Sequence, residues 1–162
     1  MASAVAYGLP LGGIDRWMDH LADEAIDFDG PVERLGERTI TLTDPHGLHI
    51  DLIEPENAGP SDHNDTGFHS VTLWVDDADP TARLLTDYFG YDQVGHETND
   101  QGERIRFQSP GKGRGSIVDI LVSDKASIGR QGAGSVHHVA FRAETDAAQK
   151  HWQDTLRTAG FD

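Results

Sequence analysis

The sequence of 162 residues contains no cysteine, which excludes disulfide bonds, thiolate metal ligands and cysteine nucleophiles. Basic residues are scarce as well, with 13 Lys and Arg against 28 Asp and Glu and a formal net charge of −15. A chain this acidic is a poor partner for nucleic acid or for an anionic membrane surface. Because the acidic residues are spread along the whole chain, we expect a halophilic protein that low salt destabilises through charge repulsion.

Long apolar runs are also missing. The longest stretch without a charged residue, 2–14, is too short to span a bilayer and is broken by Gly and Pro. The N-terminus has no basic segment of the kind that begins a signal peptide. With 36% hydrophobic residues, the chain is long enough to bury a core, and we expect a globular, cytoplasmic protein.

A repeat organises the chain. A short apolar strand pattern occurs three times, at starts 66 and 68 residues apart, in segments 5–9, 71–75 and 139–143. Each copy is followed by a helical pattern, and further strand patterns recur after the first two helices. These patterns predict two units of the order βαβββ and an incomplete third unit with one strand and one helix, over residues 1–55, 66–123 and 135–162.

Spacing within the units predicts the individual elements. Apolar residues at helical spacing predict helices at 14–25, from about residue 80 to residue 89, and at 146–158. Alternation predicts strands at 38–43, 48–53, 68–75, 92–97, 104–108, 116–122 and 136–143. The first two of these strands are joined by Asp44-Pro45-His46-Gly47, a typical turn sequence.

Strand alternation also selects candidate ligands, because neighbouring side chains of a strand point to opposite faces. In the third unit, Val139 and Phe141 are expected to pack under the helix, so His138 would face the concave side of the sheet and His137 would point away. By the same alternation, His69 of the second unit is expected to point away from the concave side.

A second candidate metal site lies on the last strands of the first two units. Asp51 and Asp119 occupy matching positions on the concave face, and His49 shares the face of Asp51. One imidazole and two carboxylates are suitable ligands for a divalent metal. Alternatively, the two aspartates line a solvated cup. Thr72 and Trp74 face the same cup, where they could contact an aromatic ligand or serve only in packing.

Four further motifs follow one another along the chain, namely Gly30-Pro31-Val32-Glu33-Arg34, Asp44-Pro45-His46-Gly47-Leu48, Gly67-Phe68-His69-Ser70-Val71-Thr72-Leu73 and Ser135-Val136-His137-His138-Val139-Ala140-Phe141-Arg142. In this order and spacing they resemble the vicinal-oxygen-chelate superfamily of glyoxalase I, bleomycin-resistance proteins and extradiol dioxygenases. More narrowly, they are similar to ring-cleaving, hydroquinone-type dioxygenases with four modules. The resemblance implies an α+β fold, in which tandem βαβββ modules form a curved mixed sheet shaped as a cup, followed here by an incomplete third module.

The resemblance also implies a metal, Fe(II) or another divalent ion, held by two histidines and a glutamate, and a small aromatic substrate of the catechol or hydroquinone type. Of these ligands only His138 falls within this sequence, at the histidine position of a fourth module. Ala4 and Ser70 stand at the corresponding positions of the first two units, which therefore resemble the non-catalytic modules of the family. The chain by itself then holds an incomplete metal site or no metal at all.

Two other functions stay open. The chain could be a non-catalytic module that binds a small ligand or supports assembly, because the third unit has an exposed strand edge and a helix face containing Trp152. Because a second copy of the chain could cover these surfaces, we expect a homodimer. A glyoxalase-like, metal-dependent lyase is the other possibility, since one fold supports many chemistries.

Overall fold

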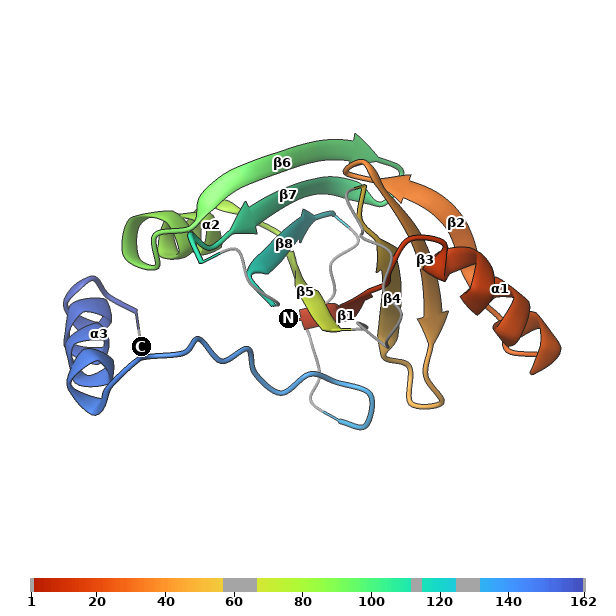
Figure 1. Ribbon diagram of the computed structural model, residues 1–162. Coiled ribbons are helices and arrows are strands. Elements are labelled where there is room, and N and C mark those ends of the chain that lie inside the picture. The colour runs from red at the N-terminus through yellow and green to blue at the C-terminus, as the bar shows by residue number, and fades with distance from the viewer. Residues whose placement is uncertain (1, 57–66, 112–114, 125–131, 162) are drawn as a thin grey trace.

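The computed structural model describes residues 2–56, 67–111, 115–124 and 132–161. Eight strands form one mixed sheet in the order β2-β3-β4-β1-β5-β8-β7-β6, which curls into a half-barrel (Figure 1). The first unit contains β1 (Ala2–Gly8), α1 (Gly13–Asp23), β2 (Asp29–Arg34), β3 (Glu37–Thr43) and β4 (His49–Glu54). The second contains β5 (Gly67–Val75), α2 (Asp79–Arg83) continued by a π-helical turn (Leu84–Tyr88), β6 (Asp92–Asn99), β7 (Gly102–Gln108) and β8 (Ile117–Val122). The predicted α+β fold of tandem βαβββ units in a curved mixed sheet is confirmed.

The two units are related by an internal two-fold arrangement at the centre of the sheet. β1 and β5 pair in antiparallel, and each is flanked on its other side by a parallel strand, β4 or β8. At the centre of this pair Val5 lies opposite Val71, with Ala4 opposite Thr72 and Ala6 opposite Ser70. Because Val5 and Val71 hold the same position in the sequence repeat, the two-fold axis passes between them.

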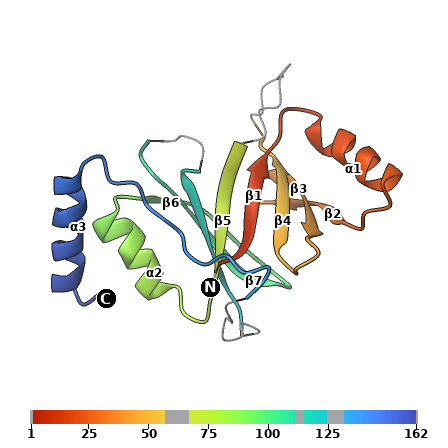
Figure 2. The same ribbon diagram turned by 90° about the horizontal axis from the view of Figure 1, so that it is seen from below.

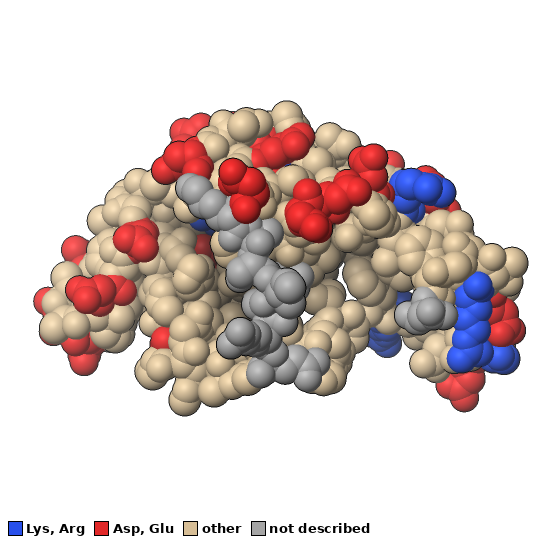
Figure 3. Space-filling view, turned by 180° about the vertical axis from the view of Figure 1, so that it is seen from behind, with Lys and Arg blue, Asp and Glu red and all other residues tan. Residues whose placement is uncertain are grey.

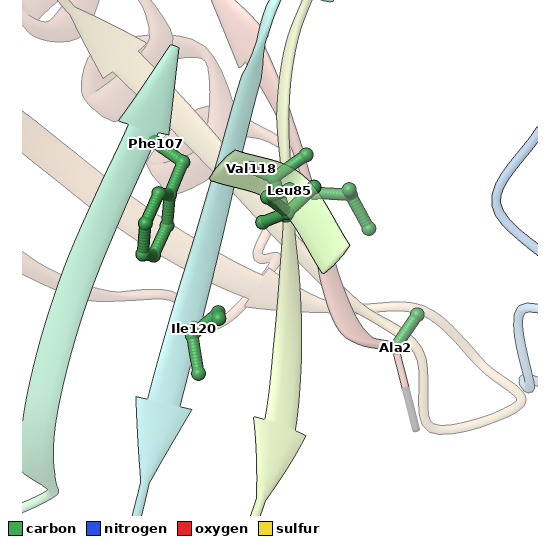
Figure 4. Close-up of a cluster of buried hydrophobic side chains, with 6 residues drawn as sticks. Ala2, Leu85, Phe107, Val118 and Ile120 are labelled. Atoms are coloured by element: carbon green, nitrogen blue, oxygen red, sulfur yellow. The ribbon is translucent and has the colours of Figure 1, made fainter. Parts of the chain in front are cut away.

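Each unit buries its own hydrophobic core. Leu9, Ile14, Leu21, Ile40 and Leu52 are buried in the first unit. The core of the second unit also includes Ala2, from β1 of the first unit (Figure 4). Its other buried residues come from the π-helical turn after α2 and from strands β5, β7 and β8, and they are Val71, Leu85, Phe107, Val118 and Ile120. Leu85 and Ile120 are 1% and 0% exposed, so these apolar side chains are removed from water almost completely.

Local interactions explain two features of the first unit. The Asp44 carboxylate accepts hydrogen bonds from the backbone N–H groups of His46 and Leu48, both at 2.8 Å, which closes the predicted turn between β3 and β4. Helix α1 has no side-chain cap of its own at Gly12. Instead, the Glu54 carboxylate at the end of β4 accepts a hydrogen bond of 3.1 Å from the Ile14 N–H. A negative charge at this end of a helix is favourable.

Among its described residues, 135–161, the third unit contains one regular element, α3 (Asp146–Thr158), at the predicted position. Its N-cap residue Thr145 accepts a hydrogen bond from the Ala148 N–H at 3.1 Å. The helix lies beside α2, and Trp152 contacts Phe89 at a ring-centroid distance of 5.2 Å (Figures 1 and 2). No helix in the described part of the chain is long and apolar enough to cross a membrane.

The predicted strand at 136–143 is wrong in this structure, where residues 135–143 form neither strand nor helix. The reason is topological, since β1 and β5 each already have a neighbour on both sides and offer no free edge. The segment instead crosses below the sheet toward α3, with Val136 and Val139 packed against the core of the second unit (Figures 1 and 2).

The carboxylate at the start of α1 provides a test of this description. We expect Glu54→Ala to lower the free energy of unfolding by about 1 kcal/mol, because the buried Ile14 N–H loses its acceptor and the helix loses a favourable charge. Urea unfolding followed by circular dichroism measures this change. The exposed Glu56→Ala serves as a control and is expected to change stability by less than about 0.5 kcal/mol. Equal effects of the two variants would contradict the capping role.

Candidate functional site

The concave face of the sheet carries a set of charged side chains, here called the cup network. Its members come from both units and are Arg34, Glu37, Asp51, His69, Glu97, Arg104, Arg106 and Asp119. Asp51 and Asp119 are 3% and 2% exposed, and the three arginines are buried too. Charged groups buried this deeply require partners, because an isolated charge in the interior is strongly unfavourable.

In the first unit the network is a buried pair on neighbouring strands. Arg34 Nη1 lies 2.7 Å from Asp51 Oδ2, and the Thr41 hydroxyl donates to Asp51 Oδ1 at 2.5 Å. Both carboxylate oxygens of Asp51 are therefore engaged by protein groups.

In the second unit Asp119 is held by two arginines. Arg106 donates through Nε at 2.8 Å and Nη2 at 3.0 Å, a two-point contact, and Arg104 Nη1 lies 3.3 Å from Oδ2. Arg104 also donates to the Thr72 hydroxyl at 3.1 Å. Burial favours the neutral form of Arg106, but the hydrogen bonds and charge of Asp119 outweigh it and raise the pKa of Arg106. Burial, helped by the nearby charge of Arg34, lowers the pKa of Arg104.

Three contacts connect the units across the cup. Arg106 Nη1 of the second unit donates to Glu37 Oε2 of the first at 2.5 Å, and the Leu35 N–H donates to Glu97 at 2.7 Å. His69 Nε2 lies 3.4 Å from Glu37. Burial works to raise the pKa of Glu37, but the hydrogen bond from His69 and the charge of Arg106 prevail, so its pKa is lowered. These contacts therefore join the two units across the concave face of the curled sheet, and they also pair the buried charges of the network.

The position of His69 corrects a prediction. It was expected to point away from the concave side, yet it contacts Glu37 in the network and lies with its Nδ1 3.0 Å from the Ser70 hydroxyl. The cause is an irregularity of the strand pair, in which Ala6 faces Ser70 and Tyr7 faces Phe68, so that His69 is an extra, unpaired residue. A β-bulge of this kind interrupts strict alternation.

The candidate set of His49, Asp51 and Asp119 does not have the geometry of a metal site here. His49 is exposed, while arginines hold both aspartates. Within the described ranges, no three His, Asp or Glu side chains form a group that could hold a metal ion. The cup is also not the solvated surface considered as the alternative, since both carboxylates are almost fully buried. Of the two candidate ligand-contacting residues, Thr72 is buried against Arg104, and Trp74 is partly buried on β5.

Sequence reasoning missed the arginines of the cup, although a signal was present. Arg104 and Arg106 alternate along β7, and the hairpin register places Arg106 directly opposite Asp119 on β8. A cross-strand pair of opposite charge is a standard stabilising contact in a sheet.

His138 and His137 lie outside the cup, on the segment between the second unit and α3. Both are exposed, with their Nδ1 atoms 3.0 Å apart and their rings perpendicular at 5.3 Å. Val139 packs against the core of the second unit, and the ring centroids of Phe141 and Phe89 lie 4.6 Å apart. The preference for His138 over His137 depends on strand alternation, which this segment lacks in the structure, so His138 stays a prediction.

A cavity of about 960 Å³ lies beside this segment. Its walls come from the ends of β5 and β8, residues 139–143 and α3. Aromatic side chains contribute much of the lining, namely Phe68, Phe89, Tyr91, Phe141 and Trp152. Arg142 lies at the same cavity, and burial raises the pKa of the Tyr91 hydroxyl despite a hydrogen bond with Ser109. This combination is suited to a flat apolar ligand with a polar edge.

The pair of Arg34 and Asp51 provides a test of the cup network. We expect Arg34→Met to cost about 3–5 kcal/mol of unfolding free energy, because it leaves Asp51 charged and buried without its cation. Adding Asp51→Leu should recover most of that loss. Urea unfolding measures both variants, and Lys150→Met, which breaks an exposed pair with Asp154, should cost far less than Arg34→Met. A loss in Arg34→Met as small as this control would show that Asp51 is not dependent on Arg34.

The lowered pKa of Glu37 predicts a dependence of stability on pH. The folded chain binds the Glu37 proton less readily than the unfolded chain, so the stabilisation is present above the unfolded pKa and is lost as the pH falls through the folded pKa. Wild type should therefore lose more stability than Glu37→Gln between about pH 7 and about pH 3. Urea unfolding at constant salt measures the difference, and parallel losses in the two proteins would contradict it.

Comparisons with known proteins agree with this fold. The family model described as Glyoxalase/Bleomycin resistance protein/Dioxygenase superfamily matches residues 67–162, more than half of the chain. The protein named "Putative ring-cleaving dioxygenase MhqO" of Bacillus subtilis is 32% identical over 96% of this chain and 51% of its own length. A chlorohydroquinone/hydroquinone 1,2-dioxygenase of Sphingobium indicum is 25% identical over 86% of this chain and 46% of its own length.

Solved structures give the same result. A crystal structure titled as a putative dioxygenase from Bacillus subtilis superposes with a TM-score of 0.81 at 32% identity, over 99% of this chain and 52% of that one. Methylmalonyl-CoA epimerase from Mycobacterium tuberculosis, at 16% identity and a TM-score of 0.53 over 75% of this chain and 86% of that one, shares the fold alone. The chain spans about half the length of the curated relatives it matches. It belongs to the glyoxalase/bleomycin resistance/dioxygenase superfamily.

Proposed function

We propose that this chain forms part of a metal-dependent dioxygenase that cleaves aromatic rings of the catechol or hydroquinone type, with His138 as a ligand of Fe(II) or another divalent metal. The similarity to proteins named as ring-cleaving dioxygenases supports the reaction class, and the hydroquinone dioxygenase supports the substrate class. The proposed substrate is a small aromatic molecule.

The choice of His138 as the metal ligand rests on one observation, which is that arginines already bind the carboxylates of the cup. Arginines engage Asp51 and Asp119, so the carboxylates on the concave face are not available to a metal ion. The exposed imidazole of His138 has no such partner other than the neighbouring His137 among the described residues. The described residues do not provide a complete ligand set, so the other ligands must come from outside this set.

The charge distribution agrees with a small-molecule function. Asp and Glu side chains are spread across the face in Figure 3, whereas Lys and Arg are visible mainly toward one side. This surface would repel nucleic acid and anionic lipid, and it supports the proposal that the protein is halophilic. A cytoplasmic location stays part of the proposal.

A second candidate is a non-catalytic module that binds a small ligand, and the aromatic cavity beside α3 favours it. A module of this kind would bind aromatic compounds without metal and without consuming oxygen. The glyoxalase-like lyase has support from the fold alone, which does not determine the chemistry.

Metal loading tests the first proposal. The 162-residue chain is loaded with Fe(II) without oxygen in high salt, desalted and assayed for iron, together with His138→Ala and, as control, the exposed histidine variant His49→Ala. We expect His138→Ala to weaken iron binding by about 10-fold or more and His49→Ala to leave it unchanged. Equal iron content in wild type and His138→Ala would refute the ligand role. Binding of hydroquinone to iron-free protein, with no oxygen uptake after loading, would favour the second candidate.

A further inference from the structure

We propose that the aromatic cavity beside α3 is a binding site for planar aromatic carboxylates, with Arg142 binding the carboxylate group. The inference rests on the second candidate function, a module that binds a small ligand, and adds the chemical class of that ligand. It requires no metal, so it is separate from the proposed ring cleavage.

The cavity lies on the face of the sheet opposite the cup. Val71 of β5 pairs with Val118 of β8, and both residues line the cavity. The next pair along these strands is Thr72 with Asp119, and both of these side chains accept hydrogen bonds from Arg104 of the cup network. Because neighbouring side chains of a strand point to opposite faces, the cavity and the cup lie on different sides of the sheet. A ligand in the cavity therefore leaves the buried ion pairs undisturbed.

Ring contacts hold the wall that faces the sheet. The ring centroids of Phe141 and Phe89 lie 4.6 Å apart, and Trp152 of α3 contacts the same Phe89 ring at 5.2 Å. Beyond the end of α3, the ring of Phe161 contacts that of Tyr88 at 5.4 Å. These contacts hold α3 and the segment before it against the second unit, so the cavity is bounded on two sides by folded structure.

The size and lining of the cavity suit a flat ring. Its volume of about 960 Å³ lies near the upper end of the range for small-molecule sites, roughly 300–1,000 Å³. The rings of Phe89 and Phe141 are inclined by 37°, whereas those of Tyr91 and Phe141 are nearly perpendicular at 83°. The lining therefore offers both ring faces and ring edges. Aromatic pairs in such orientations are stabilised beyond the apolar area that they bury, which favours an aromatic ligand over an aliphatic one of equal size.

The charge of the lining differs from that of the rest of the chain. Asp and Glu make up 28 of the 162 residues, yet neither occurs among the described residues that line the cavity, where Arg142 is the one charged side chain. Arg142 is exposed, and it forms no ion pair within the described residues. A planar guanidinium can bind a carboxylate through two parallel N–H groups. In a chain with a net charge of −15, this lining is a local site for an anionic group.

The remaining polar groups of the lining are compatible with an anion. Tyr91 and Ser109 form a hydrogen bond with each other, and burial raises the pKa of the Tyr91 hydroxyl. Tyr91 therefore stays neutral and adds no negative charge that would oppose a carboxylate. The other polar side chains of the lining are uncharged, namely Ser116, Gln149 and Gln153. Such groups can form hydrogen bonds with hydroxyl substituents on the ring of the ligand.

Two matched ligands test the proposal. 2-Naphthoate and 2-naphthamide share a ring system and nearly the same size, but only the first is an anion. We expect the metal-free 162-residue chain to bind 2-naphthoate about 10-fold more tightly, because its carboxylate forms a charge-assisted contact with Arg142. Isothermal titration calorimetry measures both affinities, at the lowest salt concentration at which the chain stays folded. Equal affinities for the two ligands, or no binding of 2-naphthoate, would overturn the proposal.

Substitution of Arg142 tests its role. Arg142→Gln should weaken binding of 2-naphthoate about 10-fold and leave binding of 2-naphthamide unchanged, which also verifies that the cavity is intact. Arg157→Gln is the matched control, because it makes the same change of charge on α3 outside the cavity lining. This control should keep the preference for 2-naphthoate. A preference that survives in Arg142→Gln, or that both variants lose equally, would contradict the role of Arg142, as would equal weakening of both ligands by Arg142→Gln.

A change in the aromatic wall tests the location. Trp152→Leu should weaken both ligands about 3- to 10-fold, because an aromatic contact is lost while apolar packing is largely kept. Trp17→Leu alters a tryptophan of the first unit, which lies outside the cavity lining, and should leave both affinities unchanged. Unchanged affinities in Trp152→Leu would place the ligand elsewhere and overturn the proposal.

Iron loading separates this inference from the proposed ring cleavage. The affinity for 2-naphthoate should be the same with and without Fe(II), and the same in His138→Ala as in wild type. Binding that requires Fe(II) and is lost in His138→Ala would overturn the role of Arg142 and support the metal site instead. Binding that persists in a chain that takes up no iron would support this inference and refute the ligand role of His138.

Discussion

The antiparallel pairing of β1 with β5 is the interaction on which the rest of the structure depends. It joins two βαβββ units into one sheet and sets the two-fold relation in which Val5 faces Val71. It also occupies the free edge of both central strands, since β4 and β8 cover the other edges. A third copy of the same strand pattern in the chain therefore finds no free edge beside β1 or β5, and residues 135–143 lie outside the sheet.

The curl of this sheet creates an interior for charged side chains. The concave face is formed by strands of both units, and the side chains of Asp51 and Asp119 are buried there. Because a buried carboxylate is unfavourable without a partner, both require cations nearby. The chain provides arginines for this purpose, and their planar, multiply donating groups can bind two carboxylates at once, as Arg106 does with Asp119 and Glu37. In this cup arginines hold the carboxylates, which illustrates that one fold can be used with different sites.

The same network affects the surface. Three of the 13 basic residues, Arg34, Arg104 and Arg106, are buried with acidic partners. Because the buried charges largely compensate one another, the large negative excess of the chain lies on the outside. Salt therefore acts on two different parts of the molecule, screening the surface repulsion strongly and the buried pairs only weakly.

The sequence by itself determined the units, the order of their elements and the family. Apolar periodicity reports which face each segment buries, so it located α1, α3 and the β3–β4 hairpin with its Asp44 turn. The tertiary structure decided the features that depend on residues far apart in the chain. Alternation could not show the β-bulge that turns His69 toward Glu37. It also could not show that β1 and β5 have neighbours on both sides, which leaves residues 136–143 without a partner beside them. It also placed Asp51 and Asp119 on the concave face without showing that arginines would hold them, because burial and partners arise only when the sheet curls.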